Sequence, residues 1–171
     1  MRIAAIVLIV ISLTSCWPTR VSFNDGSIPE EWEFFYVQTL ENNSSNTPLN
    51  YPVDLTEKLK DGLMNNTRLK IHPNEDSAQV YIEGVINSYS ITPVAVQEGD
   101  NASKNRLTVS VSFRIFTAAT AEAEESEMTL NSSKFIDYSS DTDLGTVENT
   151  LLGEVSDQIV QDVINKLMSN W

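Results

Sequence analysis

Cys16 and His72 carry the side chains best suited to nucleophilic or metal chemistry, and each is the only residue of its type in the chain. A catalytic thiolate needs a partner base such as histidine, but His72 stands directly before Pro73 in a predicted turn. A zinc site needs further Cys or His ligands, and the common hydrolase, phosphate-loop and metalloprotease motifs do not occur in the sequence. The sequence therefore predicts a protein that is not an enzyme and has no metal or other cofactor.

Cys16 lies at the end of an apolar segment, and this position favours a covalent role over a buried core thiol. The segment covers residues 3–13 and follows Arg2. It is too short to cross a bilayer, which needs about 20 residues, but it is typical of a secretory signal peptide. The stretch Leu13-Thr14-Ser15-Cys16 resembles the lipobox of bacterial lipoproteins. This resemblance implies that residues 1–15 are removed and that a lipid on Cys16 anchors the protein to the membrane.

The net charge limits the classes of partner that the protein can bind. The sequence contains 24 Asp and Glu against 11 Lys and Arg, which gives a formal net charge of −13. Such a chain gains no counterion-release attraction to a phosphate backbone, so we expect no nucleic-acid binding. The run AATAEAEESE at residues 118–127 contributes to this charge and is predicted to be a solvated turn.

The pattern of apolar residues predicts five strands and two helices. Stretches rich in β-branched and aromatic residues predict strands at residues 32–40, 68–71, 80–96, 106–117 and 128–138. Gly84 is predicted to mark a bulge in the third of these. Apolar residues at helical spacing predict helices at residues 54–66 and 146–171, with Asp54 and Thr146 as their caps.

The stretch at residues 106–117 alternates most regularly and predicts the architecture of the domain. One face is apolar and the other is mostly polar, which suits an antiparallel sheet covered on one side only. The two helices would cover the apolar face. The sequence thus predicts an α+β fold, a two-layer sandwich with two helices packed on one face of a mostly antiparallel sheet of about four strands. This domain is expected to span residues 32–171, after a lipid anchor and tether at residues 16–31.

Four stretches carry a resemblance to a known family. They are TRLKI (67–71), INSYSITPVAV (86–96), KNRLTVSVSFRI (104–115) and LLGEVSDQIVQDVINKLMSNW (151–171). With the lipobox cysteine, they resemble the LPS-assembly lipoprotein family, LptE. The resemblance covers residues 32–171, and the order of the elements and the stretch Asn105-Arg106-Leu107-Thr108 contribute most to it.

The resemblance implies a location, two partners and a role. Members of the family are anchored in the inner leaflet of the outer membrane and form a plug inside the β-barrel of the translocon protein LptD. They help that barrel to assemble and contact lipopolysaccharide on its way to the cell surface. Residues 17–20 contain no acidic residue directly after Cys16. By resemblance to lipoprotein sorting rules, this favours the periplasmic face of the outer membrane.

The acidic composition departs from what binding of anionic lipopolysaccharide would suggest. Lys104 and Arg106 flank the polar tip before the central strand, and Arg114 lies on the polar face of that strand. These three are the best candidates for contacts with sugar, phosphate or the barrel, and ordinary surface charge is the alternative. A periplasmic ligand-binding or adaptor lipoprotein unrelated to lipopolysaccharide is the second hypothesis for function. A closed apolar cavity would favour that hypothesis, whereas a packed core would favour the plug.

Overall fold

The computed structural model describes residues 28–94, 103–121 and 124–169. The description covers two α-helices, six strands and one short 3-10 turn at Glu75–Ser77. In chain order the helices and strands are β1 (Phe34–Val37), β2 (Glu41–Asn42), α2 (Tyr51–Asn66), β3 (Lys70–Ile71), β4 (Val80–Val94), β5 (Lys104–Thr117), β6 (Ser126–Ser139) and α3 (Leu144–Met168).

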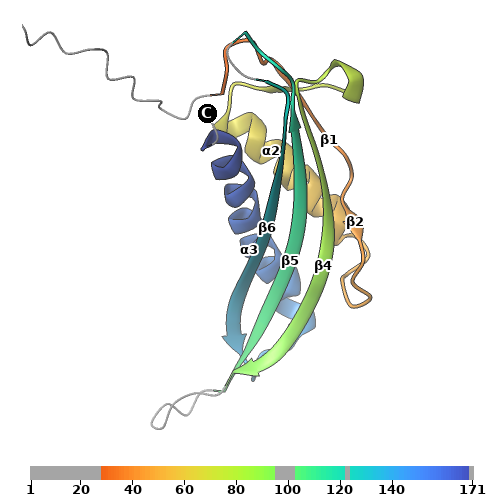
Figure 1. Cartoon of the computed structure of the whole chain (residues 1–171). Helices are drawn as coiled ribbons and strands as arrows, with labels where there is room; N and C mark the ends of the chain where they lie inside the picture. Colours follow the sequence, from red (N-terminus) through yellow and green to blue (C-terminus); the bar gives the residue numbers. More distant parts are fainter. Residues whose placement is uncertain (1–27, 95–102, 122–123, 170–171) are drawn as a thin grey trace, which may run out of the picture.

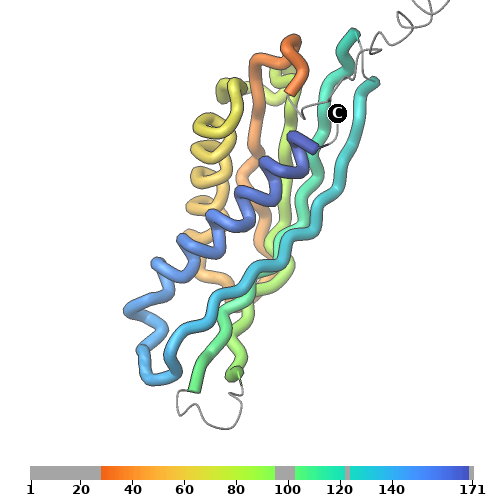
Figure 2. Tube along the Cα trace, turned by 90° about the vertical axis from the view of Figure 1, so that its left-hand side faces the viewer, coloured from red at the N-terminus to blue at the C-terminus, as the bar shows by residue number. Residues whose placement is uncertain are grey.

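All six strands belong to one mixed sheet with the order β3-β1-β4-β5-β6, and β2 pairs with β4 beyond the end of β1. The pairings of β1 and β2 are parallel, while β4, β5 and β6 form a long antiparallel meander. Both helices lie on the same side of this sheet (Figures 1 and 2). The predicted two-layer α+β sandwich is therefore confirmed. The sheet has more strands than the four expected because two short strands add to it: β3, and β2, which lies just beyond the predicted strand at residues 32–40.

The core lies between the sheet and the helices, as the alternation in β5 predicted. The exposed fraction is 1% or less for five alternate residues of β5: Leu107, Val109, Val111, Phe113 and Ile115. From the helices, α2 contributes residues such as Leu59, and α3 contributes residues such as Ile159 and Val163, all of them fully buried. Burial of such side chains stabilises the fold by about 1.5–3 kcal/mol each. Ile28, in the predicted tether, is also buried.

Both helices begin earlier than their predicted caps. α2 starts at Tyr51, and Asn50 precedes it without a side-chain capping hydrogen bond. Pro52 favours the early start, because its fixed φ suits the first turn of a helix, where no N–H partner is needed. α3 starts at Leu144, and the Thr146 hydroxyl donates to a backbone carbonyl rather than capping an N–H. The caps predicted at Asp54 and Thr146 are therefore wrong.

Gly84 does not mark a bulge, contrary to the prediction. It pairs with Phe113 in a continuous register, and the irregular step of β4 lies between Ile86 and Ser88. A Cβ atom at Gly84 would lie 2.8 Å from Cδ1 of Phe113. Glycine is needed at this position because the Phe113 ring packs directly against the backbone.

Candidate functional site

The face of the sheet that the helices leave open is the candidate functional site. Figure 1 looks at this side, with β4, β5 and β6 in front of the helices. Because side chains alternate along a strand, the residues between the core positions of β5 point to this open face. They include Ser110 and Ser112, which are half-buried, and Arg114, which is exposed.

Neutral polar side chains form the middle of this open face. Ser112 accepts a hydrogen bond of 2.6 Å from the amide of Asn87 on β4 and donates one of 2.7 Å to the amide oxygen of Asn131 on β6. The hydroxyl groups of Ser110 and Ser133 lie 2.8 Å apart. The three strands are thus joined by a ladder of hydroxyl and amide groups. Such a surface can exchange hydrogen bonds with a polar partner without carrying net charge.

Arg106 lies at one end of the open face and is neutralised there. Its Nε and Nη2 atoms donate to the two carboxylate oxygens of Asp137 over 2.6 and 2.8 Å. Its guanidinium carbon lies 3.8 Å from the ring centroid of Phe135, which remains 51% exposed. The hydrogen bond from Arg106 lowers the pKa of Asp137 below its ordinary value. The bidentate pair fixes Arg106 in one orientation.

Arg114 lies at the other end of the open face and is also neutralised. It forms an ion pair with Glu83 on β4, and its guanidinium carbon lies 5.7 Å from the ring centroid of Phe116. The rings of Tyr36 and Tyr81 stack nearby with centroids 5.7 Å apart. This end of the face therefore presents an aromatic surface and a paired cation.

The structure does not gather the three predicted contact residues into one patch. Lys104 and Arg106 both lie at the start of β5, whereas Arg114 lies eight residues further along the same strand, roughly 27 Å away. Lys104 is exposed, and none of the ion pairs among the described residues involves it. Cys16, the predicted lipid attachment site, lies outside the described residues.

The acidic partners of the two arginines, Asp137 and Glu83, were not identified from the sequence. Alternation along β4 places Glu83 on the open face, but its pairing with Arg114 depends on the register between β4 and β5. The role of Asp137 is harder to predict, because its pairing with Arg106 depends on the register between β5 and β6, which the turn between them sets. A shift of two residues in that turn would place Ser139 opposite Arg106.

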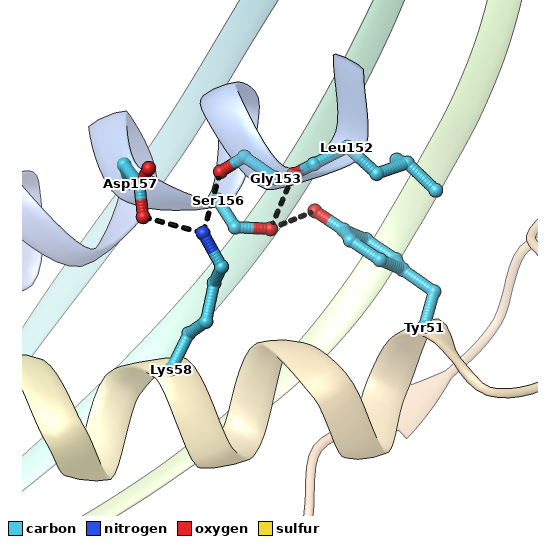
Figure 3. A network of polar contacts seen from close by, with 6 residues as sticks. All are labelled: Tyr51, Lys58, Leu152, Gly153, Ser156 and Asp157. Carbon is cyan, nitrogen blue, oxygen red and sulfur yellow. Dashed lines mark hydrogen bonds and ion pairs between the residues drawn. The ribbon is translucent and has the colours of Figure 1, made fainter. Parts of the chain in front are cut away.

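A second polar cluster joins the two helices on the other side of the molecule (Figure 3). Lys58 on α2 donates to the carbonyl of Gly153 over 2.9 Å and pairs with Asp157 over 2.6 Å, both on α3. The hydroxyl of Ser156 donates to Tyr51 over 3.1 Å, and burial raises the pKa of Tyr51 to about 12. These groups are satisfied by one another, so their geometry supports helix packing rather than catalysis.

A hollow of about 570 Å³ opens beside this cluster. Its wall includes Tyr51, Lys58 and Leu152, and its rim includes Asn50 and Asn149. Asn149 is exposed at the rim, so the hollow lies at the surface rather than inside the core. Within the described ranges, no group of three or more His, Cys, Asp or Glu residues is arranged to hold a metal ion. Among the same residues, no helix has the length and apolar character needed to cross a membrane.

Two solved lipoproteins share this fold. The crystal structure of a minor lipoprotein from Acinetobacter baumannii aligns with a TM-score of 0.51 and 14% sequence identity, covering 81% of this chain and 94% of that one. The solution structure of an uncharacterized lipoprotein B from Nitrosomonas europaea aligns with a TM-score of 0.50 and 13% identity, covering 90% and 92% of the respective chains. At these identities the likeness shows the fold alone.

The sequence matches the model of the family that the four stretches described above resemble. No curated protein matches the chain. The family model described as LptE, lipopolysaccharide-assembly, matches residues 34–167, which run from β1 to the last turn of α3. The resemblance is therefore confirmed, and the chain belongs to the LptE lipopolysaccharide-assembly family.

Proposed function

We propose that this protein is an outer-membrane lipoprotein that acts as the plug and assembly partner of an LptD-type barrel in the transport of lipopolysaccharide to the cell surface. A lipid on Cys16 would hold it at the periplasmic face of the membrane. The observation that carries this proposal is the family match over residues 34–167. No membrane-spanning helix is needed for this location, because a lipid anchor together with a barrel partner suffices.

The chemistry of the open sheet face supports a role inside a barrel. The interior wall of an outer-membrane barrel is polar. The open face offers neutral hydroxyl and amide groups at its middle, and its two arginines are already paired with Asp137 and Glu83. A surface of this kind can lie against a polar wall without burying an unpaired charge.

The packing of the core favours the plug over a ligand-carrying lipoprotein. Gly84 and Gly62 leave no room for a single methyl group, since a Cβ atom would lie 2.8 Å from Phe113 in one case and 2.3 Å from Val160 in the other. The hollow between the helices is open at the surface. A carrier of an apolar ligand is instead expected to enclose most of that ligand in an apolar cavity.

Of the three candidates, Lys104 is the one best placed to contact lipopolysaccharide. Arg106 and Arg114 would have to leave their carboxylate partners to bind a phosphate. Lys104 is exposed and belongs to none of the ion pairs of the described residues. Its ammonium group can therefore bind an anion without first breaking an ion pair. The arginines remain suited to stacking or hydrogen bonding with sugar.

The proposal is tested by purifying the tagged protein from detergent-solubilised outer membrane. A large barrel protein should co-purify in a fixed ratio and remain bound in salt. A tagged lipoprotein of another family, expressed at the same level, is the control for non-specific capture. If no barrel co-purifies with the wild-type protein, the proposed function is wrong.

A further inference from the structure

Strand β6 forms a free edge of the sheet. It is the last strand in the order β3-β1-β4-β5-β6, and it is 14 residues long. Figure 2 looks at this edge: β6 runs in front of β5, and α3 lies alongside it rather than across it. At the opposite side of the sheet, β2 and β3 have two residues each. Residues 87–94 of β4 also have no strand partner on the side away from β5, so the edge of β6 is the longest free edge among the described strands.

The hydrogen bonds of the β5–β6 ladder show which backbone groups of β6 point outward. The N–H of Ser140 donates to the carbonyl of Ser103 over 3.0 Å, and the register continues without a shift down to the pair of Thr117 and Ser126. In an antiparallel ladder, bonded and non-bonded pairs alternate. Even-numbered residues of β6 thus bond to β5, and odd-numbered residues such as Asn131 direct their N–H and C=O groups to the free edge.

The middle of β6 carries few of the features that usually prevent strand addition, since its acidic residues, Glu127 and Asp137, lie near its two ends. Natural edges are kept short or are interrupted by proline, bulges or charged side chains. β6 contains no proline and no glycine, and its register with β5 has no bulge. Its one lysine, Lys134, pairs with Asp162 of α3 over 2.8 Å and so is held toward the helices. The backbone groups of β6 are ready to pair with another strand.

The charge around the edge selects among possible strands. Glu124, Glu125 and Glu127 are exposed at the start of β6, and the ion pairs of the described residues involve none of them. Beyond the other end, Asp141 and Asp143 are exposed as well. Two copies of β6 would bring like charges together whether they paired in parallel or antiparallel. A second copy of this chain is therefore a poor occupant.

We propose that the free edge of β6 receives an extended segment of the barrel partner, with a lysine or arginine placed beside Glu124, Glu125 and Glu127. This inference rests on the proposed function, since it names the surface through which the barrel protein is held. The added strand would be bound through main-chain hydrogen bonds to the odd-numbered residues of β6, which is the ordinary mode of β-strand addition. The acidic start of β6 would fix its direction and register.

The first experiment removes one outward N–H group in the full-length protein. Asn131→Pro should lower the yield of co-purified barrel by roughly tenfold, because an edge proline blocks the added strand while leaving the bonds to β5 intact. Asn131→Ala is the matched control, since it loses the same side-chain contact with Ser112 but keeps the N–H. Equal barrel yields from the two variants would overturn the inference.

The second experiment changes charge without touching the backbone. Reversal of Glu124, Glu125 and Glu127 to lysine should reduce barrel yield at low salt. The control reverses three exposed acids on α2, away from both this edge and the open face: Asp54, Glu57 and Asp61. An equal loss in both variants would mean that only net charge matters, and would overturn the inference.

Amide hydrogen exchange distinguishes failure of the inference from failure of the proposed function. In the wild-type complex, the odd-numbered amides of β6 should exchange at least about tenfold more slowly than in the free protein. If the barrel co-purifies but these amides are unchanged, the inference fails and the proposed function stands. If no barrel co-purifies at all, both are wrong. A dimer of the free protein that Asn131→Pro abolishes would assign the edge to a second copy and overturn the inference.

Discussion

Gly62 determines how closely α2 approaches α3. A Cβ atom at this position would lie 2.3 Å from Cγ1 of Val160, a stiff and buried side chain. Gly62→Ala is expected to lower the free energy of unfolding by about 1–3 kcal/mol, because overpacking outweighs the gain in helix propensity. Gly153→Ala is the control on α3, where the nearest atom is 3.7 Å away. That variant should be as stable as the wild type or more so in urea titrations.

Asp137 provides a local probe of the ion pair with Arg106. Its pKa lies below the ordinary value of 3.8 because Arg106 donates to the carboxylate. The stabilising contribution of the pair is therefore present at neutral pH and is lost as the pH falls through the depressed pKa. In Arg106→Gln, an NMR titration of the Asp137 carboxyl should show a higher pKa. Arg114→Gln should leave it unchanged, because Arg114 lies at the far end of β5.

Lys104 is the residue at which direct binding of lipopolysaccharide is best tested. Lys104→Gln should weaken binding of purified lipopolysaccharide to the barrel complex by a few fold, because one exposed cation contributes about 1 kcal/mol or less. Lys70→Gln is the matched control, since Lys70 is an exposed lysine on β3. If both variants bind equally well, Lys104 is ordinary surface charge.

For single residues, the sequence predicted which face of the sheet each side chain occupies, but not which side chain it pairs with. Alternation along β5 correctly separated core residues such as Phe113 from open-face residues such as Arg114. It could not show that Arg114 is paired with Glu83, or Arg106 with Asp137, because those contacts depend on registers that the turns between strands decide. The three cations therefore looked equally available in the sequence, whereas among the described residues the two arginines form ion pairs and Lys104 forms none.

One carboxylate of α3 makes polar contacts with β6 in addition to the apolar packing. Asp162 accepts hydrogen bonds from Ser132 over 2.7 Å and from Lys134 over 2.8 Å, and Ser132 is buried. Asp162→Ala should lower the free energy of unfolding by roughly 1–3 kcal/mol, because the buried hydroxyl loses its partner. Asp157→Ala, on the same helix, should cost less than about 1 kcal/mol, because its pair with Lys58 is exposed. Equal losses of unfolding free energy in the two variants, measured by chemical denaturation, would contradict this prediction.

The elements themselves were largely predictable, but their ends were not. The apolar stripe of α3 and the alternation of β5 each follow a period that burial enforces over many residues. The start of a helix depends on a few local contacts instead. Asn50 and Asp143 precede the two helices without side-chain caps, so a search for capping residues found Asp54 and Thr146, which lie inside the helices.

At the scale of the whole molecule, the proposed lipid anchor on Cys16 can be tested separately from the barrel. Cys16→Ala should abolish lipid attachment, because no other cysteine is present. The intact mass should lose its acyl contribution, and the protein should leave the washed membrane fraction of cells that lack the barrel. A variant that keeps both its mass and its membrane fractionation would show that Cys16 is not lipidated.

The parallel pairing of β1 imposes an order on the folding of the chain. The meander of β4, β5 and β6 joins neighbours in sequence, whereas Phe35 must wait for Val80, its partner across a helix and a turn. Contacts between distant residues form slowly because a long loop must close first. A chain that emerges from its N-terminus therefore holds β1 without its partner β4 until α2 and β3 have emerged. The first strand of the chain can join the long meander only after residues more than forty positions later are available.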